Sequence, residues 1–150
     1  MEIIFSQFQP SDTTILTKLM MSLSSEDFSG WLATPESIQK TLDHLWQHPD
    51  KGSILMIKKG DLIAGYAILI NFWSNEYNGN VLIIDELYVL PEFRSQGIST
   101  AFINYLTETR FNDSVMLLLE VSDTNKRAMD LYYKMGFINN SYLTLKKRLG

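Results

Sequence analysis

The spacing of apolar residues divides the first third of the chain into a strand and two helices. Residues 3–8 form a mainly apolar stretch that Pro10 closes, which predicts a strand. Asp12 is suited to cap the helical pattern that follows. Thr34-Pro35-Glu36 predicts a second helix start, because a capping hydroxyl, an early proline and an acid all favour a helix N-terminus. The apolar positions of the two predicted helices are Ile15, Leu16, Leu19, Met20, Leu23, Ile38, Leu42, Leu45 and Trp46.

The middle of the chain has the pattern of antiparallel strands. Residues 53–58 and 62–72 are strand-like, and Lys59-Gly60-Asp61 between them predicts a hairpin turn. Residues 81–90 predict a further strand, joined to the hairpin by a polar and aromatic loop over residues 73–80. We therefore expect the front of the sheet to be antiparallel.

From residue 97 the pattern changes to helix, strand, helix and strand. A strand–helix–strand unit with a buried strand implies a parallel pair with a right-handed crossover. We therefore expect an α/β (α+β) fold with one mixed, mostly antiparallel sheet and about four flanking helices. The last elements predicted are helices over 98–110 and 125–135, the latter capped by Gly136, a strand buried on both faces over 115–121, and a strand over 142–148.

Composition and charge narrow the class of protein. The chain has 150 residues, which predicts a single domain over residues 1–150. Apolar residues make up 45% and charged residues 20%, as in ordinary globular proteins. The net charge of −4 argues against a nucleic-acid partner and suits a cationic small molecule. The start lacks the features of a signal peptide and no apolar run is long enough to span a bilayer, so we expect a soluble, cytoplasmic protein without membrane contact.

Metal and cysteine chemistry are disfavoured. The chain has no cysteine, which excludes disulfides, cysteine nucleophiles and thiolate metal sites. Its two histidines, His44 and His48, are four residues apart and could share a helix face. Because there is no third histidine and no glutamate follows His44, a solvated helix face is favoured over a metal site, and we expect no metal.

The segment PEFRSQGIST, residues 91–100, joins a predicted strand to a predicted helix. A turn of this kind leaves free backbone N–H groups at the positive end of the helix dipole, where a phosphate fits. Gly97 would let the backbone approach a ligand, while Arg94 would add a charge and Ser99 a small hydroxyl. The segment lacks the further glycines of a dinucleotide fingerprint and the Gly-Lys-Ser/Thr ending of a Walker loop. Alone, it is also compatible with an ordinary tight turn.

The segment VSDTNKRAMDLYYKMGF, residues 121–137, makes the pattern specific. Its Asn-x-x-Ala-x-x-Leu-Tyr-x-x-x-Gly-Phe spacing, together with Arg94-x-x-Gly97, resembles the GCN5-related N-acetyltransferase (GNAT) family. The resemblance covers nearly the whole order of elements, and it implies a GNAT fold with a splayed parallel strand pair and acetyl-coenzyme A as co-substrate. Ser99 departs from the family pattern Gln/Arg-x-x-Gly-x-Gly/Ala, but it is small, so we expect the pyrophosphate site to survive.

The resemblance also implies roles for individual residues. Backbone N–H groups of residues 94–99 would hold the pyrophosphate. The N–H of Val89 would polarise the thioester carbonyl, with Leu87 next along the strand. Tyr132 would be the general acid at the leaving sulfur, and Asn125 would lie near the pantetheine arm while also being suited to cap its helix. The coenzyme-binding residues so implied are Leu87, Val89, Arg94, Ser95, Gln96, Gly97, Ile98, Ser99 and Asn125.

Asp85 and Glu86 are the acids of the strand LIIDELYVLP. Adjacent strand residues point to opposite faces unless a bulge intervenes. One of the two should therefore face the acceptor and take its proton, through water, and the sequence leaves open which one. Polyamine acetyltransferases of the family have an acidic pair at the matching place. The alternative is one solvated acid and one structural ion pair.

The acceptor side is expected to include residues 26–31 and 73–80, whose acids and aromatic rings suit a cationic amine. The sequence thus predicts an acetyl-CoA-dependent N-acetyltransferase in which a small cationic amine of polyamine, diamine or aminoglycoside type attacks directly. The alternatives are acetylation of a protein N-terminus or lysine, and a non-catalytic CoA-binding sensor on the same fold. Family members are often dimers, so a homodimer stays open.

Overall fold

The computed structural model describes residues 2–26 and 30–150. The chain divides into two compact units, residues 1–120 and residues 121–150. The single domain predicted over residues 1–150 stays a prediction. Asp27 and Phe28, which were expected on the acceptor side, lie outside the described residues.

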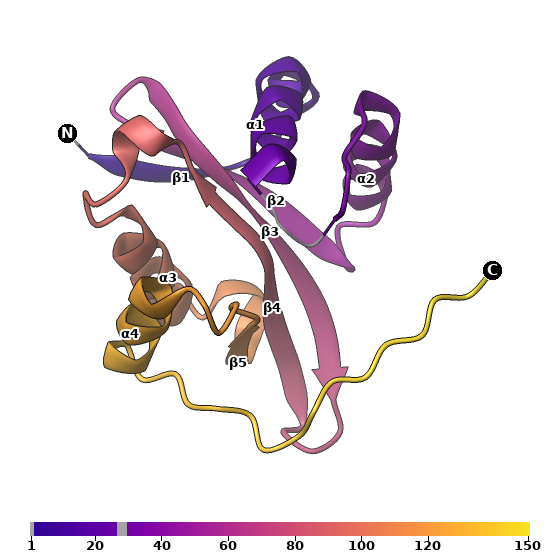
Figure 1. Ribbon diagram of the computed structural model, residues 1–150, viewed down its shortest axis with the longest axis vertical. Coiled ribbons are helices and arrows are strands. Elements are labelled where there is room, and N and C mark those ends of the chain that lie inside the picture. The colour runs from indigo at the N-terminus through magenta and orange to yellow at the C-terminus, as the bar shows by residue number, and fades with distance from the viewer. Residues whose placement is uncertain (1, 27–29) are drawn as a thin grey trace. The chain divides into compact units, whose positions relative to one another are not determined.

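The first unit is built on a mixed sheet with the strand order β1-β2-β3-β4-β5 (Figure 1). Neighbouring strands from β1 to β4 are antiparallel, whereas β4 and β5 are parallel. This confirms the mixed, mostly antiparallel sheet that the sequence predicted. The strands are β1 (Ile3–Gln7), β2 (Gly52–Lys59), β3 (Leu62–Ser74), β4 (Gly79–Val89) and β5 (Ser114–Leu119).

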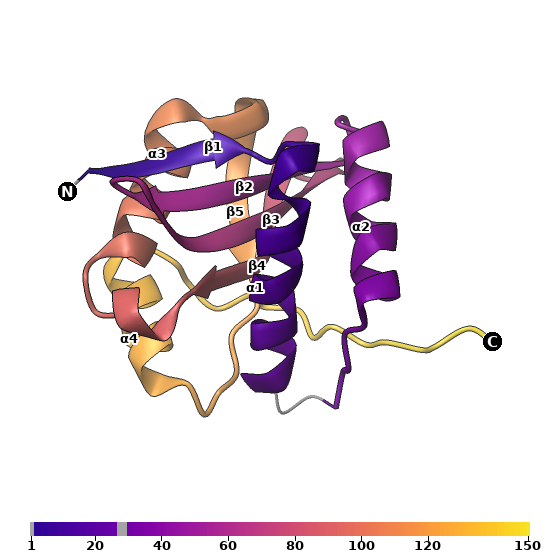
Figure 2. The same ribbon diagram turned by 90° about the horizontal axis from the view of Figure 1, so that it is seen from above.

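Helices cover both faces of this sheet. The helices α1 (Thr13–Glu26) and α2 (Pro35–Gln47) lie side by side on one face (Figure 2). The helix α3 (Ile98–Thr109) packs against the other face, because Ile98 joins a core with Ile57 and Ala64. The second unit contains α4 (Lys126–Lys134).

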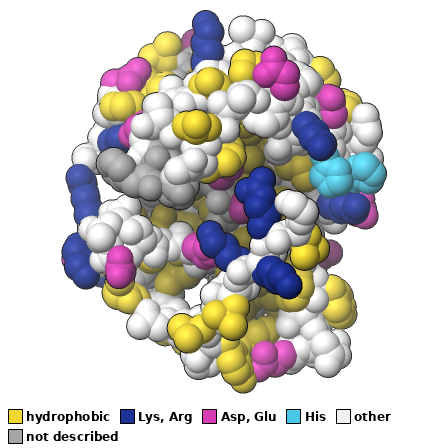
Figure 3. Space-filling view, turned by 45° about the vertical axis from the view of Figure 1, so that its right-hand side comes forward, with side chains coloured by type: hydrophobic (Ala, Val, Ile, Leu, Met, Phe, Trp, Pro, Cys, Tyr) yellow, Lys and Arg dark blue, Asp and Glu magenta, His cyan; other side chains and the backbone are white. Residues whose placement is uncertain are grey.

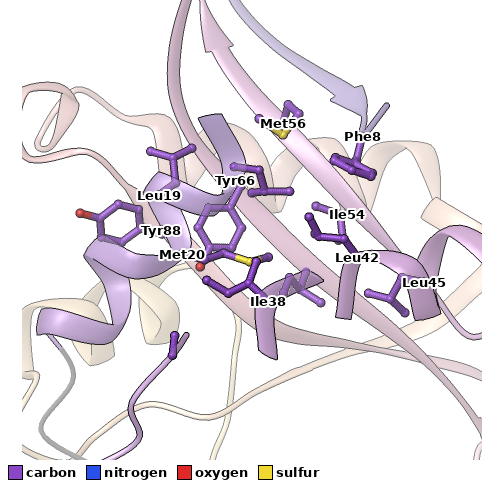
Figure 4. Close-up of a cluster of buried hydrophobic side chains, with 13 residues drawn as sticks. Phe8, Leu19, Met20, Ile38, Leu42, Leu45, Ile54, Met56, Tyr66 and Tyr88 are labelled. Carbon is purple, nitrogen blue, oxygen red and sulfur yellow. The ribbon is translucent and has the colours of Figure 1, made fainter. Parts of the chain in front are cut away.

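The larger core lies between the sheet and the pair α1 and α2 (Figure 4). Alternate residues of each strand point to this face, so Ile54 and Met56 of β2 enter this core, while Ile57, the residue after Met56, enters the α3 core. Tyr66 and Tyr88 contribute from β3 and β4. Burying each such side chain stabilises the fold by about 1.5–3 kcal/mol.

Local signals explain the helix starts. The Thr34 side chain accepts a hydrogen bond from the Ser37 N–H (3.0 Å), and the Ser37 hydroxyl oxygen accepts one from the Thr34 N–H (2.9 Å). This reciprocal cap confirms the predicted start of α2. Asp12 acts one turn earlier than expected: its carboxylate accepts the Gln9 N–H (2.9 Å) in the short turn that precedes α1.

Three predictions for loops and strands were wrong. The expected loop over residues 73–80 is shorter than predicted, since Trp73 pairs with Asn80 and only residues 75–78 form the turn of a hairpin. The strand β5 is half-buried and not covered on both faces. Residues 142–148 form no strand, and Leu145 is 89% exposed. Apolar alternation has the period of a strand, but a strand also needs a neighbouring edge to satisfy its backbone, and the second unit offers none to this segment.

Candidate active site

The turn before α3 has the geometry of an anion site. Gly97 is the N-cap residue in the left-handed region (φ 81°, ψ 12°), and a Cβ there would meet no atom within 4 Å. Its carbonyl accepts the Ala101 N–H (2.9 Å), so the N–H groups of Ile98 and Ser99 have no acceptor inside the helix. Ser95 is also left-handed (φ 63°). The turn therefore presents backbone donors to open space, which suits a phosphate.

Arg94 is placed differently from its predicted role at this turn. Its Nε donates to the Val89 carbonyl (2.8 Å), and its Nη2 donates to both Glu26 oxygens (2.8 and 3.2 Å). Its backbone N–H donates to the Pro91 carbonyl (3.2 Å). Arg94 thus ties the end of β4 to the end of α1, and residues 95–99 are left as the candidate phosphate donors.

Tyr88 completes the cluster at the end of α1. Its hydroxyl donates to Glu26 Oε2 (2.6 Å), and the Arg94 guanidinium lies 5.5 Å from its ring centroid. The Tyr88 hydrogen bond, together with Arg94, holds the pKa of Glu26 below its usual value against the opposing effect of burial. Glu26 is therefore ionised at neutral pH and fixes the start of the predicted acceptor segment.

A cation beside the phosphate turn was missed by the sequence analysis. The Lys59 ammonium donates to the Gln96 side-chain oxygen, and the Gln96 amide donates to the Glu92 carbonyl (3.0 Å). Lys59 ends β2 and lies far from the turn in sequence, so only the pairing of the strands brings the two together. It adds positive charge where an anion would bind.

The end of β4 has an open edge. Pairing with β5 stops at Ile84 and Leu119, while β4 continues to Val89. The Leu90 N–H donates to the β3 carbonyl of Ala64 (2.8 Å). Because successive strand N–H groups alternate in direction, those of Val89 and Leu87 point away from β3. These are the two N–H groups predicted to meet the thioester arm.

A β-bulge sits at the acidic pair. In the register with β3, Glu86 lies opposite Ile68. The next pair joins Ile84 to Leu69, which leaves Asp85 as an extra residue. The bulge breaks strict alternation, so the side chains of Asp85 and Glu86 both reach the face that α1 and α2 cover.

The two acids have different surroundings on that face. Glu86 accepts a hydrogen bond from the Tyr66 hydroxyl (2.7 Å), and Tyr66 is fully buried. Burial and the charge of Glu86 raise the pKa of Tyr66, so its phenol stays a donor. Asp85 instead lines a groove of about 370 Å³, together with residues of α2 and β3. Glu86 is therefore anchored in the structure, whereas Asp85 is accessible.

The pKa of Asp85 is raised, first by partial burial and then by the negative charge of Glu120. Glu120 directly follows the last residue of β5, at the place where β4 and β5 part. A raised pKa makes a carboxylate a stronger base. The sequence analysis did not single out Glu120, because its proximity to Asp85 follows from the parallel pairing alone.

The groove that Asp85 lines is called the α2 groove below. Its α2 wall is mainly polar and its β3 side is apolar. The rings of the chain's two histidines lie side by side at the surface, tilted by 35° with centroids 4.7 Å apart (Figure 3), and His44 is one of the groove residues. No group of metal-ligating side chains that could hold an ion occurs in residues 2–26 and 30–150. The groove is lined by Ser37, Lys40, Thr41, His44, Leu45, Ile68, Ile70 and Asp85.

The second unit carries the remaining candidates. Asn125 caps α4, since its side chain accepts the Ala128 N–H (3.3 Å), which confirms the helix-cap interpretation. Gly136 is left-handed (φ 96°) and ends the helix as predicted. Tyr132 packs on the Phe137 ring (centroids 5.5 Å apart), and burial raises the pKa of its phenol. Tyr132 is therefore protonated at neutral pH, as a proton donor must be.

Comparison with known proteins identifies the class of protein. Residues 17–137 match the model of the acetyltransferase (GNAT) family, and the chain belongs to this family. Over 79 residues it is 37% identical to thialysine N-ε-acetyltransferase of Bos taurus, and this match covers 52% of the chain and 46% of the relative. An uncharacterized N-acetyltransferase of Methanocaldococcus jannaschii is 29% identical over 110 residues, which cover 70% of the chain and 49% of that protein. The chain thus spans about half the length of these relatives.

Solved structures confirm the fold. A possible acetyltransferase from Clostridium difficile 630 has a TM-score of 0.84 at 23% identity, covering 98% of this chain and 97% of that one. Aminoglycoside N-acetyltransferase AAC(6')-Iy, solved in complex with CoA, has a TM-score of 0.78 at 15% identity, covering 98% and 95%. In the part of the chain that the structure describes, no helix is long and apolar enough to cross a membrane.

Proposed function

We propose that the protein transfers the acetyl group of acetyl-CoA to a primary amine of a small cationic molecule, without an acyl-enzyme. The observation that carries this proposal is the bulge at Asp85. It puts an accessible carboxylate with a raised pKa in a groove, one residue beyond the last β4–β5 pair. That is where a base would meet an amine that approaches the open edge of β4.

Acetyl-CoA supplies an acetyl group activated as a thioester. The backbone donors of residues 95–99 bind its phosphates, and Lys59 adds charge at their side. The N–H groups of Leu87 and Val89 hold the arm and stabilise the negative charge that develops on the carbonyl oxygen. These donors fit the group because the turn before α3 and the edge of β4 are both open.

Asp85 takes a proton from the acceptor ammonium, directly or through water, so that the nitrogen gains a free electron pair. As the C–N bond forms, the C–S bond breaks, and Tyr132 gives its proton to the departing sulfur. The nitrogen releases a second proton to water, from which Tyr132 recovers its own. The reaction therefore releases one proton to solvent for each acetyl group transferred.

The relatives support an amine acceptor. The thialysine N-ε-acetyltransferases are named for a primary amine at the end of a side chain. The net charge of −4 and the acids of the site favour a cation. Acetylation of a protein N-terminus or lysine is the alternative enzyme function, and a CoA-binding sensor is the alternative without catalysis.

A panel of amines assayed with acetyl-CoA tests the proposal. We expect thiol release, with matching acetylated product by mass spectrometry, for at least one small diamine, polyamine, amino acid or aminoglycoside. Thiol release with only a peptide acceptor would favour the protein-acetylating alternative. Tight binding of acetyl-CoA without transfer to any acceptor would favour the sensor.

Tyr132→Phe is expected to lower kcat by about 10²-fold and to leave the Kd for acetyl-CoA nearly unchanged. The ring still packs on Phe137, but the proton donor is lost. Tyr133→Phe is the matched control, because the Tyr133 hydroxyl is already paired with Asn139 (2.7 Å) and should not affect turnover. Equal kcat for the two variants would give the acid role to water.

Glu120→Gln is expected to shift the acid limb of the pH–rate profile to lower pH. Asp85 acts as a base only when it is ionised. Because its pKa is raised, it ionises at a higher pH than an ordinary aspartate does. Removing the charge of Glu120 lowers the pKa of Asp85 but leaves the effect of burial, so the shift is partial. kcat/KM measured against pH checks this, and an unmoved acid limb would mean that a group other than Asp85 controls it.

A further inference from the structure

The α2 groove carries unpaired charges of opposite sign. Lys40 lies on its α2 wall and Asp85 on its sheet side. Neither Lys40 nor Asp85 forms an ion pair within residues 2–26 and 30–150. Both side chains are exposed. A ligand can therefore engage both charges without breaking an existing ion pair.

The wall that holds Lys40 is one face of α2. Residues three and four apart on a helix share a face, which brings Lys40 and His44 into line with Ser37. The Ser37 hydroxyl is already hydrogen-bonded, because Ser37 forms the reciprocal cap with Thr34. Thr41 also lines this wall, and its hydroxyl donates to the Ser37 carbonyl (3.5 Å). The side-chain groups on this wall that make no hydrogen bond within the described residues are the Lys40 ammonium and the His44 imidazole, on residues whose backbones lie about 6 Å apart along the helix axis.

The charges select among small amines. A polyamine would bring a second ammonium toward Lys40 and be repelled there. A molecule with an ammonium at one end and a carboxylate at the other satisfies both sides of the groove, and Ile68 and Ile70 suit the methylenes between them. A volume of about 370 Å³ is ample for a ligand of this size.

We propose that the acceptor is an amino acid whose side chain ends in a primary amine, with that amine at Asp85 and its carboxylate on Lys40 and His44. This inference rests on the proposed function and narrows its substrate class. Lys40 is then a specificity-determining residue. Charge-assisted hydrogen bonds to the carboxylate would supply the preference for the amino acid.

Acceptors that differ only in the carboxylate test the inference. Lysine, cadaverine and lysinamide carry the same aminoalkyl chain, and only lysine has the acid. We expect kcat/KM for Nε-acetylation of lysine to exceed that for cadaverine or lysinamide by about 10-fold or more, mainly through KM. Lys40→Gln should reduce this ratio about 10-fold, whereas Lys40→Arg, which keeps the charge, should retain most of it.

Lys18→Gln is the control, because Lys18 is an exposed lysine on α1 outside the groove. The ratio of lysine to cadaverine should not change in this variant. If cadaverine matches or exceeds lysine, or if Lys40→Gln leaves the ratio unchanged, the carboxylate site is wrong while amine acetylation stands. If acetyl-CoA binds and a peptide is acetylated but none of these small amines is, both the proposed function and this inference are wrong.

Discussion

Asp85→Asn is expected to lower kcat for amine acetylation by about 10²–10³-fold at neutral pH, with little change in the Kd for acetyl-CoA. The amide has nearly the same shape as the carboxylate, but it cannot accept the proton of the acceptor ammonium. Asp85 makes no hydrogen bond within the described residues, so the fold should survive the change. Thiol release with a saturating amine measures the loss, and thermal unfolding checks the fold.

Part of the lost rate should return at alkaline pH. There the free amine is abundant in solution, and a base in the site matters less. A generic packing defect would lower the rate equally at every pH. A pH–rate profile of Asp85→Asn that runs parallel to the wild type would therefore remove Asp85 from the role of base and leave Glu120 and Glu26 as the next carboxylates to test.

Glu86→Gln is the matched control for this experiment. The amide oxygen can still accept the Tyr66 hydrogen bond, so we expect a small effect on rate and a loss of about 1 kcal/mol or less in the free energy of unfolding. If Glu86→Gln lost activity as Asp85→Asn does, and regained it at high pH, the two acids would have the opposite roles.

Local signals in the sequence predicted most of the fold, because those signals act within a few residues. Thr34-Pro35 starts α2 and Gly136 ends α4. Each of these signals depends only on the backbone of the helix end where it lies. The period of apolar residues placed strands β1 to β5 within a few residues of their observed bounds. The tail over residues 142–148 shows the limit of this reasoning, since alternation reports the period of a strand and not the presence of a partner.

The candidate site was predictable only in outline. The acidic pair Asp85 and Glu86 was evident in the sequence. The bulge was not, because the pattern of one strand cannot reveal that it has one residue more than the strand with which it pairs. The contacts of Arg94 with Glu26 and of Lys59 with Gln96 join residues 68 and 37 positions apart. Such contacts depend on how strands and helices are packed, which local sequence does not encode.

Gly97→Asp is expected to weaken the binding of acetyl-CoA by at least about 10²-fold. An aspartate at the N-cap would place a carboxylate among the backbone donors that a phosphate requires, and its own side chain would cap the helix in place of the ligand. A Cβ at Gly97 meets no atom within 4 Å, so the loss would not come from a steric clash inside the protein. Isothermal titration calorimetry with acetyl-CoA measures the affinity.

Gly97→Asn separates charge from conformation in this experiment. Asparagine has almost the same size as aspartate, caps helices equally well, and tolerates the left-handed conformation that Gly97 adopts (φ 81°). We expect Gly97→Asn to lose less affinity than Gly97→Asp by about 10-fold, because only the aspartate repels the phosphates. Dephospho-CoA and pantetheine extend the comparison: the difference between the two variants should persist for dephospho-CoA, which keeps the pyrophosphate, and vanish for pantetheine, which has no phosphate. If the two variants still differed in their affinity for pantetheine, the assignment of the phosphate site to this turn would be wrong.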